Sequence, residues 1–313
     1  MPTLVSLIQS GLRCIPPRLA WRFGGWGGDF FGSLPTRDAK RCRDMLAKGY
    51  PDKDAAWVAR MARKTFRHVG RMALWTAATM HWDIRRMHRG IVVESPENLR
   101  ELMRSLKRGE GTVGFTGHIG NWELLSRAGS VFGPLTVVGK RLRSPLADAL
   151  IQGARINCGA HLLYQDAPFA DFAREVRSGR LLAVLIDQDI ERLAGMFVPW
   201  FGDLAYTPTG PAAIAQLTRS PVVCVFLYEK AGRWVLHCSP RVRFPRTRNS
   251  AADILAITTW ATAYEEAIVR RTPHQWAWWH RRWRTRPKEA SGSPDVLMSP
   301  EVRKSGSPEV SHQ

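Results

Sequence analysis

The stretch GTVGFTGHIGNWELL, from Gly111 to Leu125, decides the fold class and holds the first candidates for chemistry. Its first six residues form a short apolar run, which predicts a buried strand over 111–116. A helix is predicted over 121–131, with Asn121 as its N-cap because a short polar side chain suits that position. The turn between strand and helix contains His118, and Glu123 follows five residues later.

His118 and Glu123 can meet only because the chain bends between them. In one continuous helix, residues five apart lie about 140° apart around the axis, at roughly 100° per residue. Across a strand-to-helix turn, the carboxylate can instead orient the imidazole as a general base for a hydroxyl nucleophile. Open α/β sheets build their sites at the carboxyl ends of strands, which favours this interpretation over an accidental pair.

The composition narrows the class of partner. A chain of 313 residues can bury a full core, and 46 Lys and Arg against 27 Asp and Glu give a net charge of +19. This excess predicts an anionic partner: nucleic acid, an acidic protein or an anionic membrane surface. Thirteen tryptophans beside many arginines are typical of a lipid–water boundary. For any single tryptophan, packing in the core is the simpler explanation.

The sequence also indicates a compartment. Five cysteines, an odd number without a CxxC pair, disfavour a disulfide framework or a zinc site, and this favours a reducing environment. No charge-free apolar run reaches the ~18–20 residues that span a bilayer. The N-terminus lacks the basic start of a signal peptide. We therefore expect a protein of the cytosol or of the cytosolic face of a membrane.

Three segments are predicted along the chain. Residues 1–36 are apolar and rich in Gly and Trp, and the run 4–8 begins a series of short amphipathic helices. Such a segment either lies in a membrane interface or covers the core as a lid. Residues 37–287 form the main domain. The tail 288–313 is rich in Ser, Pro and Gly and is expected to be disordered.

A long helix predicted over 54–80 has two different faces. One face is apolar, and the other is a cationic stripe made of Arg60, Arg63, Lys64, Arg67 and Arg71. A solvated surface is the usual explanation of such a stripe. Like charges at i, i+4 repel, however, so an acidic partner or anionic lipid is the alternative explanation.

From residue 90 the chain alternates strands and helices. Strands are predicted over 91–93, 111–116, 135–139, 160–164, 181–186, 222–228 and 233–239. Helices are predicted over 96–107, 121–131, 144–157, 167–178, 209–218 and 251–271. This order predicts an α/β fold with a central, largely parallel sheet flanked by helices, in which the last two strands are antiparallel.

Four motifs follow one another along the chain. They are GHIGNWEL (117–124), DQD (187–189), GMFVPWFG (195–202) and QWAWWHRRW (275–283), the last followed by Arg286-Pro287. Together they resemble the bacterial lipid A late acyltransferases, the lauroyl and myristoyl transferases of the lysophospholipid acyltransferase superfamily. The resemblance covers roughly residues 20–287. It implies a glycerolipid acyltransferase-like fold with an amphipathic helical N-terminus.

The resemblance also implies a reaction. A fatty acyl chain would move from a carrier thioester, on acyl carrier protein or coenzyme A, to a hydroxyl of a lipid A precursor or related glycolipid. The enzyme would need no cofactor or metal and would sit peripherally on the cytoplasmic side of the inner membrane. An anionic glycolipid acceptor and the membrane surface, and no nucleic acid, are then the partners besides acyl carrier protein. Acyl carrier protein is acidic, and the cationic stripe over residues 60–71 is its expected docking surface.

Site residues carry over by position. His118 would take the proton from the acceptor hydroxyl, and Glu123 would hold the imidazole. Arg155 and Asp187 match site positions of the family, although a structural ion pair between them is the competing explanation. Further candidates for contact with substrate are Lys140 and Asn121. In the C-terminal box, the tryptophans either cap the core, with Arg281, Arg282 and Arg284 solvated, or contact lipid.

Other classes remain as alternatives. A related lysophospholipid or other glycolipid O-acyltransferase is the nearest one, although this chain lacks the EGTR-type phosphate motif of the glycerolipid branch. A basic nucleic-acid-binding or membrane-binding protein without activity would also explain the charge, but no recognition module is visible. A serine hydrolase is disfavoured because the chain has no G-x-S-x-G motif.

Overall fold

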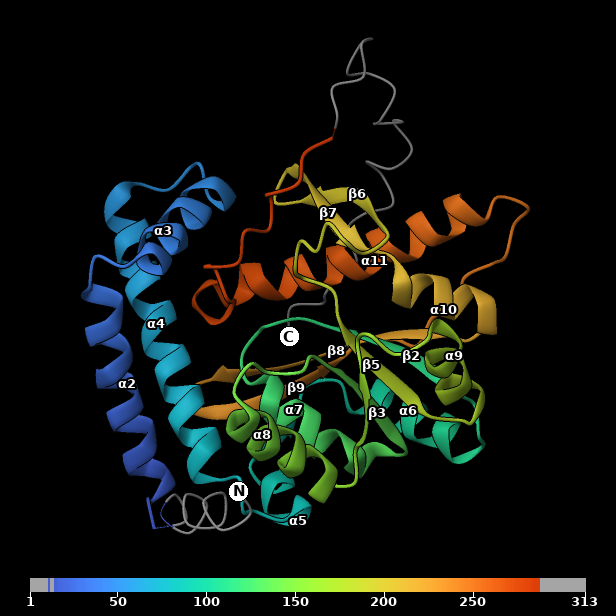
Figure 1. Ribbon diagram of the computed structural model, residues 1–313, viewed down its shortest axis with the longest axis horizontal. Coiled ribbons are helices and arrows are strands. Elements are labelled where there is room, and N and C mark those ends of the chain that lie inside the picture. Colours follow the sequence, from blue (N-terminus) through green and yellow to red (C-terminus); the bar gives the residue numbers. More distant parts are fainter. Residues whose placement is uncertain (1–10, 12–13, 288–313) are drawn as a thin grey trace.

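The structure, a computed structural model, describes residue 11 and residues 14–287, so the predictions for the run 4–8 and for the tail 288–313 lie outside the described residues. A seven-stranded sheet forms its centre, in the order β1-β9-β8-β2-β5-β3-β4 (Figure 1). The strands are β1 Ile91–Val93, β2 Thr112–Thr116, β3 Leu135–Gly139, β4 His161–Tyr164, β5 Leu181–Leu185, β8 Val222–Lys230 and β9 Arg233–Cys238. All neighbours are parallel except β8 and β9, which confirms the predicted α/β class and the late antiparallel pair.

Helices cover both faces of this sheet (Figure 1). On one face lie α6 Pro96–Lys107, α7 Trp122–Ala128 with the short helix η1 Gly129–Phe132, and α8 Pro145–Asn157. The other face is covered by α9 Phe169–Arg177, α10 Gly210–Thr218 and α11 Ser250–Arg271. Alternate residues of β2 point to opposite faces, and Val113 and Phe115 enter the core beneath α10 and α11. The sheet therefore separates two apolar cores.

A two-stranded hairpin, β6 Gly195–Trp200 and β7 Asp203–Pro208, was not predicted. Its two-residue turn has Phe201 at φ 52° and Gly202 at φ 80°, the left-handed pair that tightens a hairpin. Phe201 tolerates this backbone because its N–H donates to Glu266 of α11 at 2.7 Å and its ring packs against Tyr50 and Trp278. The hairpin lies over α11 and anchors the C-terminal segment (Figure 1).

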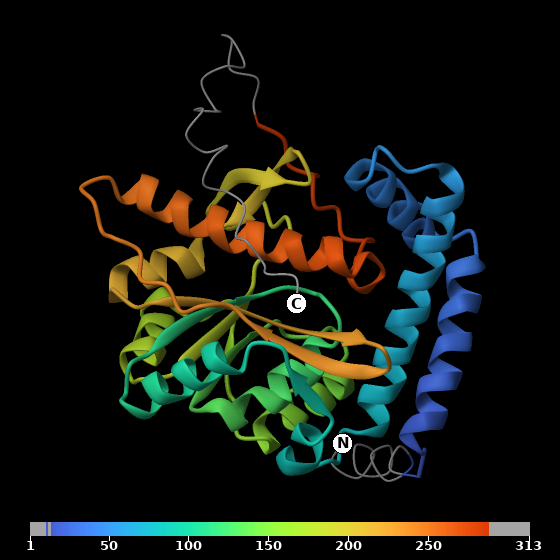
Figure 2. The same ribbon diagram turned by 180° about the vertical axis from the view of Figure 1, so that it is seen from behind.

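Among the described residues, four helices precede the first strand: α2 Pro17–Ser33, α3 Arg37–Gly49, α4 Ala55–Ala78 and the short α5 Ile84–His88. The short helix η2 Pro273–Gln275 follows α11. Residues 17–33 form one continuous helix rather than several, and it runs along α4 at one side of the molecule (Figure 2). Asp54 begins α4 by accepting the Trp57 N–H at 2.6 Å.

Glycines allow α2 and α4 to pack backbone against backbone. A Cβ added at Gly24 would overlap the carbonyl oxygen of Gly70, and one added at Gly28 would overlap that of Phe66. At Gly32 the neighbour is the Phe66 side chain, 2.8 Å away. Small residues spaced by four therefore line the contact and permit a close approach that larger residues would prevent.

Gly28→Leu is expected to separate α2 from α4 and to lower the free energy of unfolding by about 1–3 kcal/mol, the usual cost of overpacking. Gly27→Ala is the matched control, because a Cβ at Gly27 meets nothing within 4 Å and alanine favours a helix. Thermal unfolding and limited proteolysis of α2 measure both effects. Equal stability of the two variants would contradict the glycine contact.

The outward face of α2 is apolar. Its large exposed side chains, each between 42% and 62% accessible, are Leu19, Phe23, Trp26, Phe30 and Phe31. The first four lie three or four residues apart and therefore form one row along the helix. The segment thus covers α4 with one face, as a lid would, and presents an amphipathic surface with the other. Among the described helices, none is long and apolar enough to cross a membrane.

Part of the cationic stripe on α4 is covered rather than solvated. Arg67 donates to the Asp29 carboxylate of α2 at 2.8 and 2.9 Å, and Arg71 lies over the Trp21 ring at 5.4 Å. Arg60, Arg63 and Lys64 remain exposed. Docking of acyl carrier protein on the whole stripe would require α2 to move, so that hypothesis now concerns only these three residues.

Candidate active site

His118 lies in the loop after β2, and its partner is Asp187, which follows β5. The two strands are parallel neighbours, so both residues emerge at the same edge of the sheet. One Asp187 oxygen lies 2.8 Å from His118 Nδ1, and the other accepts the His118 backbone N–H at 2.8 Å. The carboxylate is fully buried, whereas the imidazole is 21% exposed. A fixed carboxylate therefore holds a histidine that solvent and substrate can reach.

Trp276 completes the support of Asp187, and this contact was not predicted from the sequence. Its indole N–H donates to Asp187 Oδ2 at 2.9 Å. Burial by itself raises the pKa of this carboxyl, but the nearby His118 and the donated hydrogen bonds outweigh it, so the pKa of Asp187 is held well below its usual range. Asp187 is therefore ionised at neutral pH.

These contacts fix the tautomer of His118. Because Asp187 can only accept, Nδ1 carries the proton and Nε2 keeps its lone pair. The Gln188 amide nitrogen lies 3.4 Å from this Nε2 and 3.2 Å from Nε2 of His280. Burial, with the positive charge of a protonated His118, lowers the pKa of His280 to about 4, so His280 is neutral. The exposed Nε2 of His118 is thus prepared to accept a proton.

The loop carrying His118 is held by its backbone. Gly120 has φ 57°, and a Cβ there would overlap the Leu227 carbonyl oxygen. The Gly120 N–H donates to the Gln275 carbonyl oxygen at 2.8 Å. The Gly120 carbonyl oxygen lies 3.2 Å from Nε2 of His68 on α4. The glycine is therefore required both for the turn and for the close approach of β8.

The predicted contact between Glu123 and His118 is wrong. Glu123 accepts two hydrogen bonds from Arg155, at 2.6 and 3.1 Å, and this ion pair is mostly buried. Glu123 lies in the first turn of α7 and faces Arg155 of α8, whereas the imidazole turns towards Asp187 after β5. The competing prediction, an ion pair between Arg155 and Asp187, is also wrong, since each has another partner. A catalytic role of Glu123 stays a prediction, and it would act through Arg155.

Asn121 and Lys140 differ in their surroundings. Asn121 is fully buried, accepts the Leu124 N–H at 2.8 Å as the N-cap of α7, and pairs with Thr76 of α4. These partners occupy its side chain, and its contact with substrate stays a prediction. Lys140 follows β3 at the same edge of the sheet as His118 and is exposed. Its contact with a phosphate stays a prediction.

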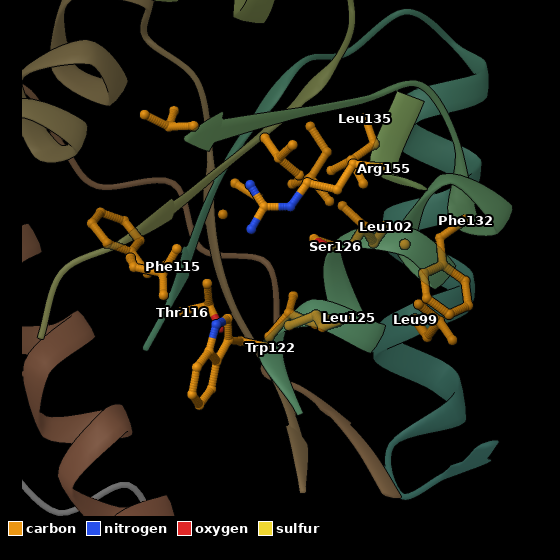
Figure 3. A pocket seen from close by; sticks show the side chains of 18 residues that line it. Leu99, Leu102, Phe115, Thr116, Trp122, Leu125, Ser126, Phe132, Leu135 and Arg155 are labelled. Carbon is orange, nitrogen blue, oxygen red and sulfur yellow. The ribbon is translucent and has the colours of Figure 1, made fainter. Parts of the chain in front are cut away.

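An apolar cavity opens beside this site, between the sheet and helices α6 and α7. Its walls come from β2, β3, β5, β8, α6, α7, α8 and η1. Figure 3 shows Arg155 pointing into the cavity near Thr116 and Trp122, with Leu99 and Phe132 farther away. Trp122 joins the cavity to the base, because its ring centre lies 5.1 Å from that of His118. A hydrocarbon chain fits these walls chemically.

A second carboxyl group, which was not predicted from the sequence, lies behind the loop that carries His118. Glu265 of α11 is fully buried, and neither oxygen has a hydrogen-bond partner among the described residues. A Cβ added at Gly117 would overlap its Oε1 and touch the Asp187 Cγ at 3.3 Å. Burial, then the charge of Asp187, raises the pKa of Glu265 well above its usual range, against the influence of Arg282. Burial therefore favours the neutral, protonated form of Glu265 in the folded protein.

The C-terminal box belongs to the core. Trp276, Trp278 and Trp283 are buried, which favours the capping interpretation over lipid contact for these three. Arg282 is also fully buried, so its predicted solvation is wrong. It donates to the Tyr206 carbonyl at 2.7 Å and to the Thr207 hydroxyl at 2.6 Å. These bonds join the box to the β6–β7 hairpin.

One group in the described chain has metal-ligand types close together. His118, Asp187 and His280 each offer a ligand atom, and these atoms lie within 4.8 Å of one another. Both Asp187 oxygens already accept hydrogen bonds, from His118 and Trp276. The arrangement is complete as a hydrogen-bonded base, and the expectation that no metal takes part stays a prediction.

Comparisons with known proteins show the family of this chain. The description "bacterial lipid A biosynthesis acyltransferase" belongs to a family whose sequence profile matches residues 3–285. The lipid A biosynthesis lauroyltransferase of Escherichia coli (strain K12) is 24% identical over 278 residues, 88% of each chain. The lipid A biosynthesis palmitoleoyltransferase of the same strain is 23% identical over 268 residues, 83% of this chain and 84% of that one. The phosphatidylinositol mannoside acyltransferase of Mycolicibacterium smegmatis is 25% identical over 194 residues, 59% of this chain and 61% of that one. As the resemblance implied, the chain belongs to the bacterial lipid A biosynthesis acyltransferase family and is an acyltransferase.

Proposed function

We propose that this enzyme moves a fatty acyl chain from an acyl carrier thioester to a hydroxyl group of a lipid A precursor or related glycolipid. The observation that carries the proposal is the position of the His118–Asp187 pair beside an apolar cavity, with Trp122 in contact with both. The relatives named above support a glycolipid acceptor, because lipid A and a phosphatidylinositol mannoside are both glycolipids.

The chemistry follows from the tautomer of His118. Nε2 takes the proton from the acceptor hydroxyl as its oxygen attacks the thioester carbonyl carbon. Asp187 stabilises the imidazolium that forms, because its carboxylate already receives the Nδ1 proton. The tetrahedral intermediate then expels the thiolate, which takes the proton from Nε2. An ester bond has formed, a thioester bond has broken, and His118 is neutral again.

The donor and the surface are part of the proposal. A carrier thioester would place its hydrocarbon chain in the cavity, whose walls are apolar apart from Arg155 and a few hydroxyls. Acyl carrier protein is acidic, and Arg60, Arg63 and Lys64 are exposed cations on α4 that suit it. The aromatic row of α2 suits peripheral attachment to the cytoplasmic side of the inner membrane.

Purified enzyme tests the reaction directly. It is incubated with a lipid A precursor and with carrier or coenzyme A thioesters of several chain lengths, and mass spectrometry identifies the product. We expect an acylated glycolipid from wild type and a loss of about 10²–10⁴ in rate from a folded His118→Ala variant. Wild-type rates from that variant would reject the mechanism. Acylation of a lysophospholipid but not of the glycolipid would reject the acceptor.

A further inference from the structure

A second hollow lies far from the cavity, between α2 and α4. It is lined by four arginines, Arg22, Arg63, Arg67 and Arg71, together with Trp26 and Asp29. We call it the α2–α4 groove. The hollow exists because glycines bring the two helices together at their backbones, so that the arginine stems of α4 lie along the side of α2.

The charges in this groove do not balance. Asp29 is its single carboxylate, and it is committed to Arg67 by two hydrogen bonds of 2.8 and 2.9 Å. Arg63 is a weaker partner of the same carboxylate, at 3.6 Å and 66% exposed. Four guanidinium groups around one carboxylate leave an excess of about three positive charges, which repel one another unless an anion joins them.

Two of the arginines lack a carboxylate partner among the described residues. Arg71 is held in place, because its guanidinium lies over the Trp21 ring and its Nε lies against Gly25, where an added Cβ would come within 2.9 Å. That Nε is buried and has no hydrogen-bond partner in the described chain. Arg22 lies over the Trp26 ring at 5.8 Å. Both guanidinium groups are therefore oriented by aromatic rings, and neither forms an ion pair with a carboxylate of the described residues.

We propose that the α2–α4 groove binds the headgroup phosphate of an anionic phospholipid in the leaflet on which the enzyme works. Guanidinium groups match phosphate oxygens in pairs, which favours phosphate over a single carboxylate. Trp26 belongs both to the groove and to the exposed aromatic row that includes Phe23 and Phe30. A lipid whose phosphate enters the groove thus has its acyl chains beside apolar side chains. The inference rests on the proposed attachment of α2 to the membrane.

Soluble short-chain lipids test the groove separately from that attachment. Dihexanoyl phosphatidylglycerol, kept below its micelle concentration, is titrated into the full-length enzyme, and dihexanoyl phosphatidylcholine serves as the zwitterionic comparison. We expect saturable binding of the anionic lipid and at least tenfold weaker binding of the other. Inorganic phosphate at matched ionic strength is the third arm. Binding of phosphate as tight as that of the anionic lipid would replace the lipid site with a site for free phosphate.

A double variant, Arg22→Gln with Arg71→Gln, identifies the residues. Its matched control is Arg100→Gln with Arg104→Gln on α6, which removes the same charge from exposed positions on the opposite side of the molecule (Figure 1). We expect the groove variant to lose about tenfold in affinity for the anionic lipid and the control less than twofold. Acyl transfer to detergent-dispersed substrate should stay unchanged in both. Equal affinity of the two variants would overturn the proposal.

Vesicle flotation then separates the groove from the attachment of α2. Phe23→Ser with Phe30→Ser should lower the binding of all vesicles, whereas the groove variant should lose only the preference for vesicles containing phosphatidylglycerol. If the serine variant floats like wild type, the attachment by α2 fails while the soluble-lipid result still decides the groove. If the groove variant keeps the preference, the groove assignment fails while attachment stands.

Discussion

Asp187→Asn is expected to lower kcat by about 10²–10⁴ while the protein stays folded. Three donors converge on this carboxylate: the His118 N–H, the His118 Nδ1–H and the Trp276 indole N–H. A carboxylate can accept all three hydrogen bonds, but an amide has only one accepting oxygen. The amide nitrogen of asparagine must therefore face a donor, and turning it towards Nδ1 favours the tautomer with the proton on Nε2. That imidazole cannot take a proton from the acceptor.

The measurement is steady-state kinetics beside a thermal unfolding curve. Asp203→Asn is the matched control, because Asp203 pairs with Lys48 and Arg286 near the surface, away from His118. We expect Asp203→Asn to keep a kcat within a few-fold of wild type. A folded Asp187→Asn enzyme with normal kcat would show that His118 needs no partner, and the proposed base would then be wrong.

The same assay tests the corrected role of Glu123. Glu123 contacts Arg155 and not the imidazole. Glu123→Gln and Arg155→Gln therefore break the same ion pair at the cavity. Residues that act through one shared contact give changes in activation free energy that do not add. The double variant should therefore be little worse than either single variant. Additive losses would return Glu123 to a direct part in catalysis.

The sequence predicted the sheet well because its strands are short apolar runs with local patterns. The strand before His118, the late antiparallel pair and most helices agree with the structure within a few residues. The β6–β7 hairpin was missed, because its pairing depends on a left-handed Phe201 that only the contact with Glu266 and the packing against Trp278 make acceptable. Propensity at a single position contains no such information.

The sequence predicted that several of the candidate residues gather at one edge of the sheet, but not their contacts. His118, Glu123, Arg155 and Asp187 all lie at one edge of the sheet, as the strand-to-helix turns implied. Their pairing depends on the strand order, which places Asp187 after β5, and not Glu123 of α7, against Nδ1 of the imidazole. Spacing along the chain made Glu123 the nearest acid, whereas Asp187 is 69 residues away. Trp276 and Glu265 reach the site from still more distant segments.

Gly117→Ala is the second substitution for which we expect a large effect, and it concerns the close contact with Glu265. The new methyl group would overlap Glu265 Oε1 and press on Asp187, so the loop that carries His118 must move. We expect a loss of about 1–3 kcal/mol in the free energy of unfolding. A displacement of about 1 Å at the base also predicts a loss of roughly 10² in kcat. Gly153→Ala in α8 is the control, since a Cβ there meets nothing within 4 Å.

Shortening Glu265 should relieve the overlap. In a double-mutant cycle, Gly117→Ala with Glu265→Ala should recover stability and activity relative to the sum of the single changes, with a coupling of about 0.5–3 kcal/mol. Additive effects in that cycle would mean that the two side chains do not meet. The cycle therefore tests the contact whatever the cost of either single substitution.

The protonation of Glu265 has a separate consequence for stability. Its pKa is raised in the folded protein, so between the ordinary value near 4.5 and the raised value the folded state holds a proton that the unfolded state releases. The stability contributed by this group is complete below pH 4.5 and decreases as the pH rises above it. Glu265→Gln removes the titration but keeps the shape, so the variant should gain stability over wild type as the pH rises from 5 to 8. Denaturant unfolding at several pH values measures this difference, and a constant difference across that range would mean that Glu265 is ionised in the folded enzyme.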